Sequence, residues 1–147
     1  MNSDFRDLLQ LLNEEKSEYL LVGAHAVIFY SEPRYTKDID IWVSVHGDNP
    51  EKVYRALKRF GAPVSILKID EIRKENLVYQ MGVPPNRIDI LFGIDGISFS
   101  EAWPNRVISD YAGVQMNLIS KEDLIRNKTA SGRPQDLLDL SKLTRLP

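Results

Sequence analysis

Hydrophobic side chains along this chain follow two spacings, one typical of helices and one typical of strands. In residues 3–16, apolar positions such as Phe5, Leu8 and Leu12 recur with a helical period, which predicts an amphipathic helix capped by Ser3. Further helices are expected over residues 24–30, 49–60 and 70–75, from Ser120 to a stop at Gly132, and from Pro134 onward. Strands are expected over residues 19–22, 37–45, 64–69, 77–81, 87–94 and 114–119.

Proline and glycine mark several of these boundaries. Pro50 suits the first turn of the helix over 49–60, and Gly61 suits its C-terminal end. A turn over 82–86 predicts that the strands on either side of it form a hairpin. Residues 95–113 show mixed patterns, with a break at Trp103-Pro104.

The C-terminal third continues the alternation of strand and helix. Ser120 is expected to cap its helix, with Asp123 as the capping-box partner. The final helix is expected to bury its leucines, namely Leu137, Leu138, Leu140 and Leu143. The order of elements predicts an α+β fold in which helices flank a mixed β-sheet, and the length of 147 residues predicts a single domain over 1–147.

Composition excludes several classes of function. The chain has no cysteine, so a disulfide scaffold, a zinc ribbon and a thiol nucleophile are excluded. The formal net charge of −2 lacks the overall basic character of a constitutive nucleic-acid binder. The sequence contains no apolar run near the roughly 18 residues that a membrane span requires. The N-terminus has acids and no apolar signal core, so we expect a cytoplasmic protein without membrane attachment.

A pair of acids stands out in the strand expected over 37–45. Because side chains alternate along a strand, Asp38 and Asp40 share one face, while Ile39 and Ile41 share the other. The apolar face fixes the register, because a shift of one residue would bury both acids. Two carboxylates this close repel each other unless a cation lies between them. Mg²⁺ or Mn²⁺ suits such oxygen ligands, and Mg²⁺ commonly shares them with substrate phosphates.

The strand expected over 87–94 repeats this design. Asp89 faces opposite to Ile88 and Ile90, so it becomes a third ligand if the two strands are neighbours. Three carboxylates suit two-metal phosphoryl or nucleotidyl transfer, in which metals bridge the attacking and leaving oxygens. The alternative is that these acids are ordinary solvent-facing strand residues.

A glycine between a strand and a helix offers a second candidate feature. Gly23 would allow the backbone to approach a phosphate, and the free N–H groups of the following helix favour anions. Arg34 lies close before the acidic pair, and its forked donors suit triphosphate oxygens, unless it is a solvated loop residue. Thr36 has the strand parity of Asp38 and is either a donor that orients it or ordinary strand content. Tyr35 and Trp42 either stack on a base or pack in the core or an interface.

The order of these motifs resembles the nucleotidyltransferase superfamily that includes DNA polymerase β. The similar pattern is a strand, Gly23-Ala24 and a helix, then Arg34-Tyr35-Thr36-Lys37-Asp38-Ile39-Asp40, then a distant Asp89. The small bacterial group related to minimal nucleotidyltransferases and abortive-infection toxins looks most similar, and the likeness extends from about residue 19 to residue 143. The second turn residue departs from the pattern, because the superfamily often has glycine or serine where this chain has Ala24.

The resemblance implies a nucleotidyltransferase-like core with C-terminal helices, and a Mg²⁺-dependent enzyme that moves NMP from an NTP, such as ATP, to an acceptor hydroxyl. Asp38, Asp40 and Asp89 would be the catalytic and metal-binding residues. Nucleotide-binding residues would be Gly23, Ala24, Arg34, Thr36 and Lys128, with Arg133 nearby. The acceptor could be RNA, a protein or a small molecule, and the chain could be half of a toxin–antitoxin pair. The alternative is a non-catalytic module of the same fold that binds a nucleotide or a protein partner.

Overall fold

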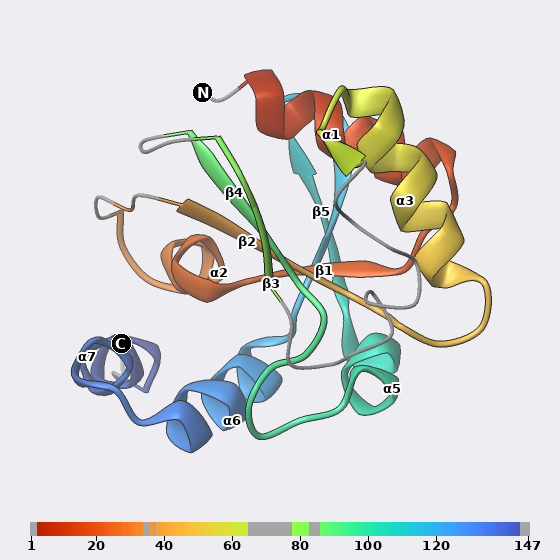
Figure 1. Ribbon diagram of the computed structural model, residues 1–147. Coiled ribbons are helices and arrows are strands. Elements are labelled where there is room, and N and C mark those ends of the chain that lie inside the picture. Colours follow the sequence, from red (N-terminus) through yellow and green to blue (C-terminus); the bar gives the residue numbers. More distant parts are fainter. Residues whose placement is uncertain (1–2, 34–35, 37, 65–77, 83–85, 145–147) are drawn as a thin grey trace.

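The chain forms one six-stranded β-sheet with helices on both sides (Figure 1). The computed structural model describes residues 3–33, 36, 38–64, 78–82 and 86–144. The strands are β1 (Tyr19–Val22), β2 (Asp38–Val43), β3 (Val78–Met81), β4 (Arg87–Leu91), β5 (Val107–Tyr111) and β6 (Val114–Leu118). The helices are α1 (Ser3–Glu14), α2 (Gly23–Tyr30), α3 (Asn49–Phe60), α5 (Phe99–Ala102), the 3₁₀ helix η2 (Trp103–Asn105), α6 (Lys121–Ser131) and α7 (Pro134–Leu143).

The sheet is mixed, in the order β3-β4-β2-β1-β6-β5. Strand β2 pairs with β1 in antiparallel and with β4 in parallel orientation. The hairpin between β3 and β4 is antiparallel, as predicted. Strand β6 pairs in parallel with β1 and in antiparallel orientation with β5. These pairings confirm the α+β class and put β2 beside β4, which the proposed three-carboxylate site requires.

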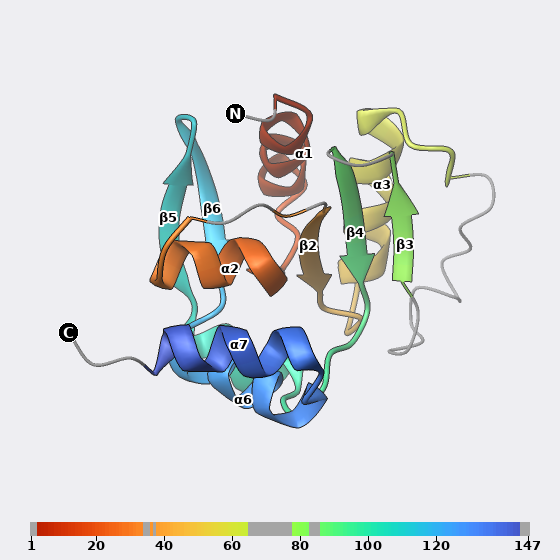
Figure 2. The same cartoon turned by 90° about the vertical axis from the view of Figure 1, so that its left-hand side faces the viewer.

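The two sides of β2 meet different helices. Helices α1 and α3 pack together on one side of the sheet, and α2, α6 and α7 lie on the other (Figures 1 and 2). Ile39 and Ile41 are buried, as the alternating pattern predicts. Trp42 has the parity of the two acids but is also buried, because the ring of Phe99 packs edge-on against it at 4.9 Å. Trp42 is therefore a core residue rather than a base-stacking one.

The predicted helix ends are largely confirmed. Gly61 and Gly132 adopt the left-handed conformation at the C-termini of α3 and α6. The Ser120 side chain accepts a hydrogen bond from the backbone N–H of Asp123 at the start of α6. The Asp123 carboxylate accepts a hydrogen bond from the Asn105 side chain, 3.3 Å away. The predicted cap by Ser120 is therefore confirmed, whereas the Asp123 side chain has Asn105 as its partner.

Three strand predictions differ from the structure. The strands expected over 37–45 and 87–94 end earlier than predicted, because β2 ends at Val43 and β4 ends at Leu91. Strand β5 was not recognised within 95–113, because an edge strand that is largely exposed has no clear alternation of apolar and polar side chains. Apart from Val64, the strand expected over 64–69 and the helix expected over 70–75 lie outside the described residues.

Helix α7 corrects the prediction for the last helix. Leu137 and Leu138 are exposed, at 58% and 61%, whereas Asp136 and Asp139 are fully buried. Leu143 is buried as predicted. The helix turns its acids inward because a buried lysine of α6 lies there and binds both of them. Within the described residues, no helix is long and apolar enough to cross a membrane.

Candidate metal and nucleotide site

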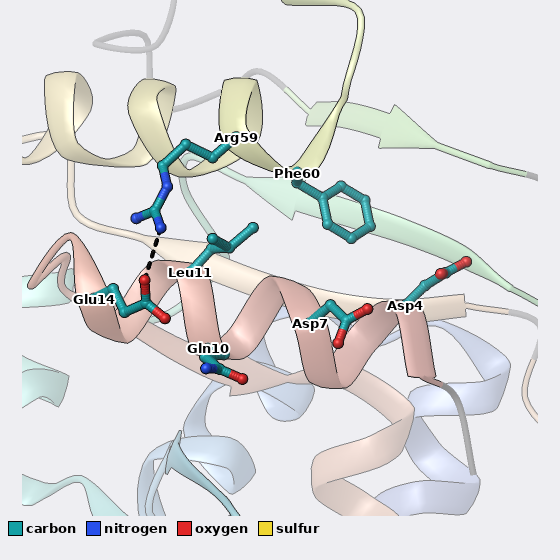
Figure 3. Close-up of a pocket in the computed structure, with 7 residues that line it drawn as sticks. All are labelled: Asp4, Asp7, Gln10, Leu11, Glu14, Arg59 and Phe60. Atoms are coloured by element: carbon teal, nitrogen blue, oxygen red, sulfur yellow. Dashed lines mark hydrogen bonds and ion pairs between the residues drawn. The ribbon is translucent and has the colours of Figure 1, made fainter.

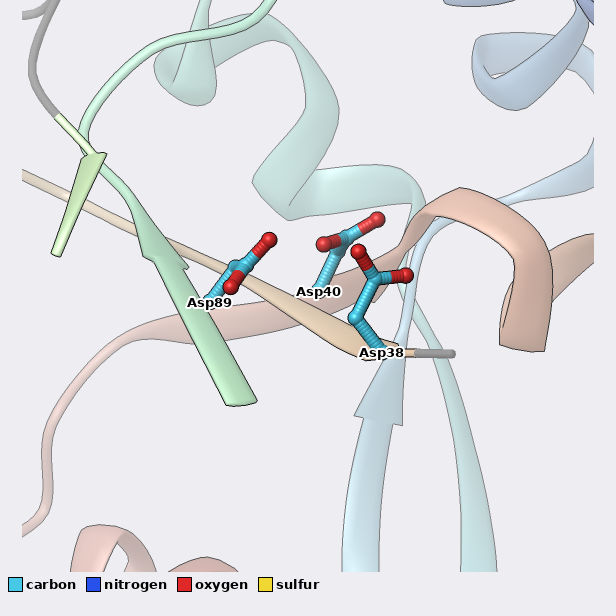
Figure 4. A group of neighbouring side chains, drawn as sticks. All are labelled: Asp38, Asp40 and Asp89. Atoms are coloured by element: carbon cyan, nitrogen blue, oxygen red, sulfur yellow. The ribbon is translucent and has the colours of Figure 1, made fainter. Parts of the chain in front are cut away.

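Three carboxylates converge where β2 and β4 run side by side. The register places Asp40 directly opposite Asp89, and the side chains of Asp38, Asp40 and Asp89 rise from the same face of the sheet (Figure 4). One oxygen from each carboxylate can be chosen such that all three lie within 4.8 Å of one another. The predicted convergence of the three acids is therefore confirmed as geometry.

Arg87 binds two of these carboxylates. Its Nε donates to Asp89 Oδ1 at 3.1 Å, and its Nη2 donates to Asp89 Oδ2 at 3.1 Å and to Asp38 Oδ2. Arg87 lies opposite Asp38 in the parallel register and two residues before Asp89, so all three side chains share one face. The alternation rule that located the acids could also have placed Arg87 beside them, although an arginine at the start of a strand has no distinctive signal by itself.

The charges at this site are out of balance. Burial, together with the negative charges of Asp38 and Asp89, raises the pKa of Asp40 to about 7, although Lys128 and Arg87 oppose the shift. Burial also raises the pKa of Asp89, against the influence of Arg87. Full ionisation is thus unfavourable without an added cation. The donors are carboxylate oxygens, which are the ligands that Mg²⁺ and Mn²⁺ prefer, so the residues present fit a divalent ion.

Gly23 brings the start of α2 close to this cluster. Its φ is +68°, and a Cβ atom built at this position would lie 2.1 Å from Asp40 Oδ2. Any side chain here would therefore collide with the carboxylate. In the structure the glycine allows a close approach to Asp40, and its predicted approach to a phosphate stays a prediction. Ala24 follows within α2, which has no side-chain cap at its N-terminus.

A pocket of about 360 Å³ opens beside Asp40. Among the predicted nucleotide-binding residues, Gly23 and Lys128 line it, together with Arg133. The other lining residues are Val22, Val78, Leu91, Gly93, Ile94, Asp95, Asn127 and Ser131. Asn127 and Ser131 could not be found from the sequence, because a polar residue on a helix carries no distinctive signal by itself.

Thr36, another predicted nucleotide-binding residue, does not line this pocket. The Thr36 hydroxyl donates to the backbone carbonyl of Asp38 at 3.1 Å, so it supports the start of β2 rather than the carboxylate. Arg34 and Tyr35 lie outside the described residues. The nucleotide-binding roles of Arg34, Thr36 and Ala24 remain predictions.

Lys128 is held by buried acids at the wall of the pocket. Its Nζ lies 3.0 Å from Asp136 Oδ1 and 3.2 Å from Asp139 Oδ2, and all three side chains are buried. Burial alone would raise the pKa of Asp136, but hydrogen bonds from Arg133, Ser131 and Lys128 outweigh it and lower that pKa. Asp136 and Asp139 thus form a buried acidic pair built around a lysine.

A larger hollow lies on the other side of the sheet, between α1 and α3. It has a volume of about 570 Å³ and is lined by Asp4, Asp7, Gln10, Leu11, Glu14, Arg59 and Phe60 (Figure 3). Arg59 is bound to Glu14 at 2.7 Å, and the hollow contains none of the three converging acids. Size therefore does not identify the functional site of this chain.

Strand β2 with its two acids, the third acid on β4 and the strand–glycine–helix junction beside them together define a nucleotidyltransferase fold. Comparison with known families agrees with this class. Residues 3–144 match a family described as nucleotidyltransferases of unknown function (DUF6036), and the chain belongs to that family. A search of curated proteins found no match.

Proposed function

We propose that this chain transfers a nucleoside monophosphate from a nucleoside triphosphate to an acceptor hydroxyl, with Mg²⁺ or Mn²⁺ held by Asp38, Asp40 and Asp89. The observation that carries the proposal is the convergence of three carboxylates within 4.8 Å, one of which, Asp40, lines a pocket with two basic residues. Membership of a nucleotidyltransferase family supports the same reaction class.

The pocket suggests how the reactants would be held. Lys128 and Arg133 would bind triphosphate oxygens, and the backbone at Gly23 and Ala24 would supply N–H donors. A bound divalent ion would neutralise phosphate charge and orient the attacking oxygen. Asp89 would help to remove the proton of the acceptor hydroxyl. The acceptor oxygen bonds to the α-phosphorus as the bond to pyrophosphate breaks, and pyrophosphate leaves with the electron pair.

Nucleotide titration tests the metal requirement. We expect ATP or GTP to bind in the presence of Mg²⁺ or Mn²⁺ and to lose most of its affinity when a chelator is added. Asp40→Asn should bind the metal–nucleotide complex more weakly and should lose pyrophosphate release. Asp7→Asn is the matched control, because Asp7 is an exposed acid on α1, across the sheet from the site. Equal nucleotide affinity with and without chelator would refute the metal site.

A non-catalytic nucleotide-binding module is the second candidate function. Arg87 already satisfies two of the three acids, and Ala24 has no hydroxyl to offer a phosphate. Both candidates predict metal-dependent nucleotide binding, but only the enzyme predicts release of pyrophosphate. Incubation of labelled NTP with RNA, protein and aminoglycoside-type acceptors separates them, because transfer to any acceptor excludes the binding module.

We further propose, from the resemblance to abortive-infection toxins, that the chain acts as one half of a toxin–antitoxin pair. Expression of the wild-type chain in a bacterial host should then slow growth, and Asp40→Asn should abolish the effect. Co-expression of the protein encoded by the neighbouring gene should restore growth. Equal growth with the wild-type and Asp40→Asn chains would refute the toxin–antitoxin proposal but not the proposed nucleotidyl transfer.

A further inference from the structure

The guanidinium of Arg87 ties β2 to β4 through their acids. It makes a two-point contact with Asp89 and a further contact with Asp38. A charge-assisted, forked contact of this kind is stronger than an ordinary hydrogen bond and fixes the geometry of both partners. Because the Arg87 side chain is 29% exposed, its charged end has solvent beside it and can leave without unpacking the core.

Arg87 uses three of the four oxygens that Asp38 and Asp89 could offer to a metal. Both oxygens of Asp89 and one oxygen of Asp38 accept from Arg87. A divalent ion that takes an oxygen from each of these acids would lie within a few ångströms of the guanidinium, at roughly 2 Å from the shared oxygens. Two cations at that separation repel each other strongly. The bridge from Arg87 to Asp38 and a bound ion therefore disfavour each other.

We propose that Arg87 is an internal counter-ion that competes with the divalent ion for Asp38 and Asp89. Without an ion, Arg87 holds the two acids together and balances part of their charge. When an ion binds, the guanidinium leaves Asp38 and turns toward solvent. Arg87 thereby sets the affinity of the site for its metal. This inference rests on the proposed divalent site.

Metal affinity is the first test, because removing a purely structural residue would weaken binding whereas removing a competitor strengthens it. In Mn²⁺ titrations followed by calorimetry, we expect Arg87→Gln to bind about tenfold more tightly than the wild type, which corresponds to about 1.4 kcal/mol. Arg55→Gln is the control, since it removes the same charge from α3 on the other side of the sheet. Its affinity should stay within about twofold of the wild type, as additivity predicts for a distant residue. Thermal melts in chelator should show both variants folded.

The two possible failures are distinguishable. If the wild type binds Mn²⁺ but Arg87→Gln binds it equally or more weakly, the competition is refuted and the proposed function stands. If neither protein binds Mn²⁺ at millimolar concentrations, both the metal site and the competition are refuted. Equal tightening in Arg87→Gln and Arg55→Gln would show an effect of net charge and would also refute the competition.

A direct observation of Arg87 separates displacement from a charge effect at a distance. In ¹H–¹⁵N spectra, the Nε–H resonance of Arg87 is assigned by its absence from Arg87→Gln. Addition of Mg²⁺ should shift this resonance toward the position of an unpaired arginine, while that of Arg55, which pairs with Glu15, stays in place. An Arg87 resonance that does not move while Mg²⁺ binds would overturn the proposal.

Discussion

Asp40 is half-buried among like charges, while its two neighbours share the guanidinium of Arg87. Its pKa of about 7 means that a folded, ion-free protein holds the Asp40 proton at a pH where the unfolded chain has lost it. A free carboxyl in an unfolded chain titrates near ~3.9. Proton binding and metal binding are therefore alternatives at this residue, and each has consequences for stability.

The first prediction concerns pH in the presence of chelator. Because the folded pKa is raised, the contribution of Asp40 to stability is full below about pH 4 and is lost as the pH rises through about 7. The free energy of unfolding of the wild type should thus fall relative to that of Asp40→Asn between pH 5 and pH 8, by the order of 1–3 kcal/mol. Urea unfolding at several pH values measures the difference. If the difference in unfolding free energy between the two proteins does not change with pH, the pKa of Asp40 is not raised and the prediction is wrong.

The second prediction concerns the close approach at Gly23. Gly23→Ala must place a Cβ 2.1 Å from Asp40 Oδ2 in addition to adopting a positive φ. Gly47→Ala is a matched control, since Gly47 has a φ of +60° and no heavy atom within 4 Å of its Cβ position. We expect Gly47→Ala to cost about 1 kcal/mol of stability and Gly23→Ala about 2–4 kcal/mol. Urea unfolding of both variants compares the costs, and equal values would mean that Asp40 moves aside freely.

Helix α7 shows how one buried charge can set the orientation of an element. A helix with four leucines would ordinarily turn them inward, but Lys128 of α6 is buried beside it and takes both Asp136 and Asp139. An unpaired buried ammonium is far more costly than two exposed leucines, so the ion pairs decide which face packs. The sequence pattern could not show this, because it depends on a residue from another helix.

The third prediction follows from this arrangement. Lys128→Met leaves two fully buried carboxylates without their ammonium and should cost about 3–5 kcal/mol of stability. Leu138→Gln, on the exposed face of α7, should change stability by no more than about 0.5 kcal/mol. Chemical unfolding of both variants measures the contrast. A large loss in Leu138→Gln with little loss in Lys128→Met would restore the leucine face as the buried one.

On the scale of the whole molecule, local sequence patterns predicted most of the helices and strands, but apart from the hairpin between β3 and β4 they did not predict which of these elements lie next to one another. The strand parity of Asp38, Asp40 and Asp89 was readable because apolar neighbours fix it. The sequence alone leaves open whether β2 and β4 are neighbours, and the order of the strands in the sheet shows that they are. The contact of Arg87 with Asp38 depends on that same register. The pocket wall formed by Lys128 likewise depends on how α6 packs, which no local pattern contains.

The fourth prediction concerns the whole folding equilibrium. An ion that binds the folded chain and not the unfolded one stabilises it by about 2.7 kcal/mol when present at 100 times its dissociation constant. Mg²⁺ should therefore raise the melting temperature of the wild type and should remove the pH dependence assigned to Asp40. Asp89→Asn should respond less, because it lacks one charged ligand. Melts that are unchanged by Mg²⁺ up to tens of millimolar would contradict the proposed site.

The register between β2 and β4 also bears on how the protein is synthesised. Arg87 lies 49 positions after Asp38 along the chain, and Lys128 follows later still. A nascent chain that has left the ribosome only as far as residue 80 therefore carries the acidic pair but neither its counter-ion nor its third partner. The proposed site is completed only when Lys128 and Arg133 have emerged, so a product that terminates between Asp40 and Lys128 has the acidic pair without the pocket wall that would bind a triphosphate.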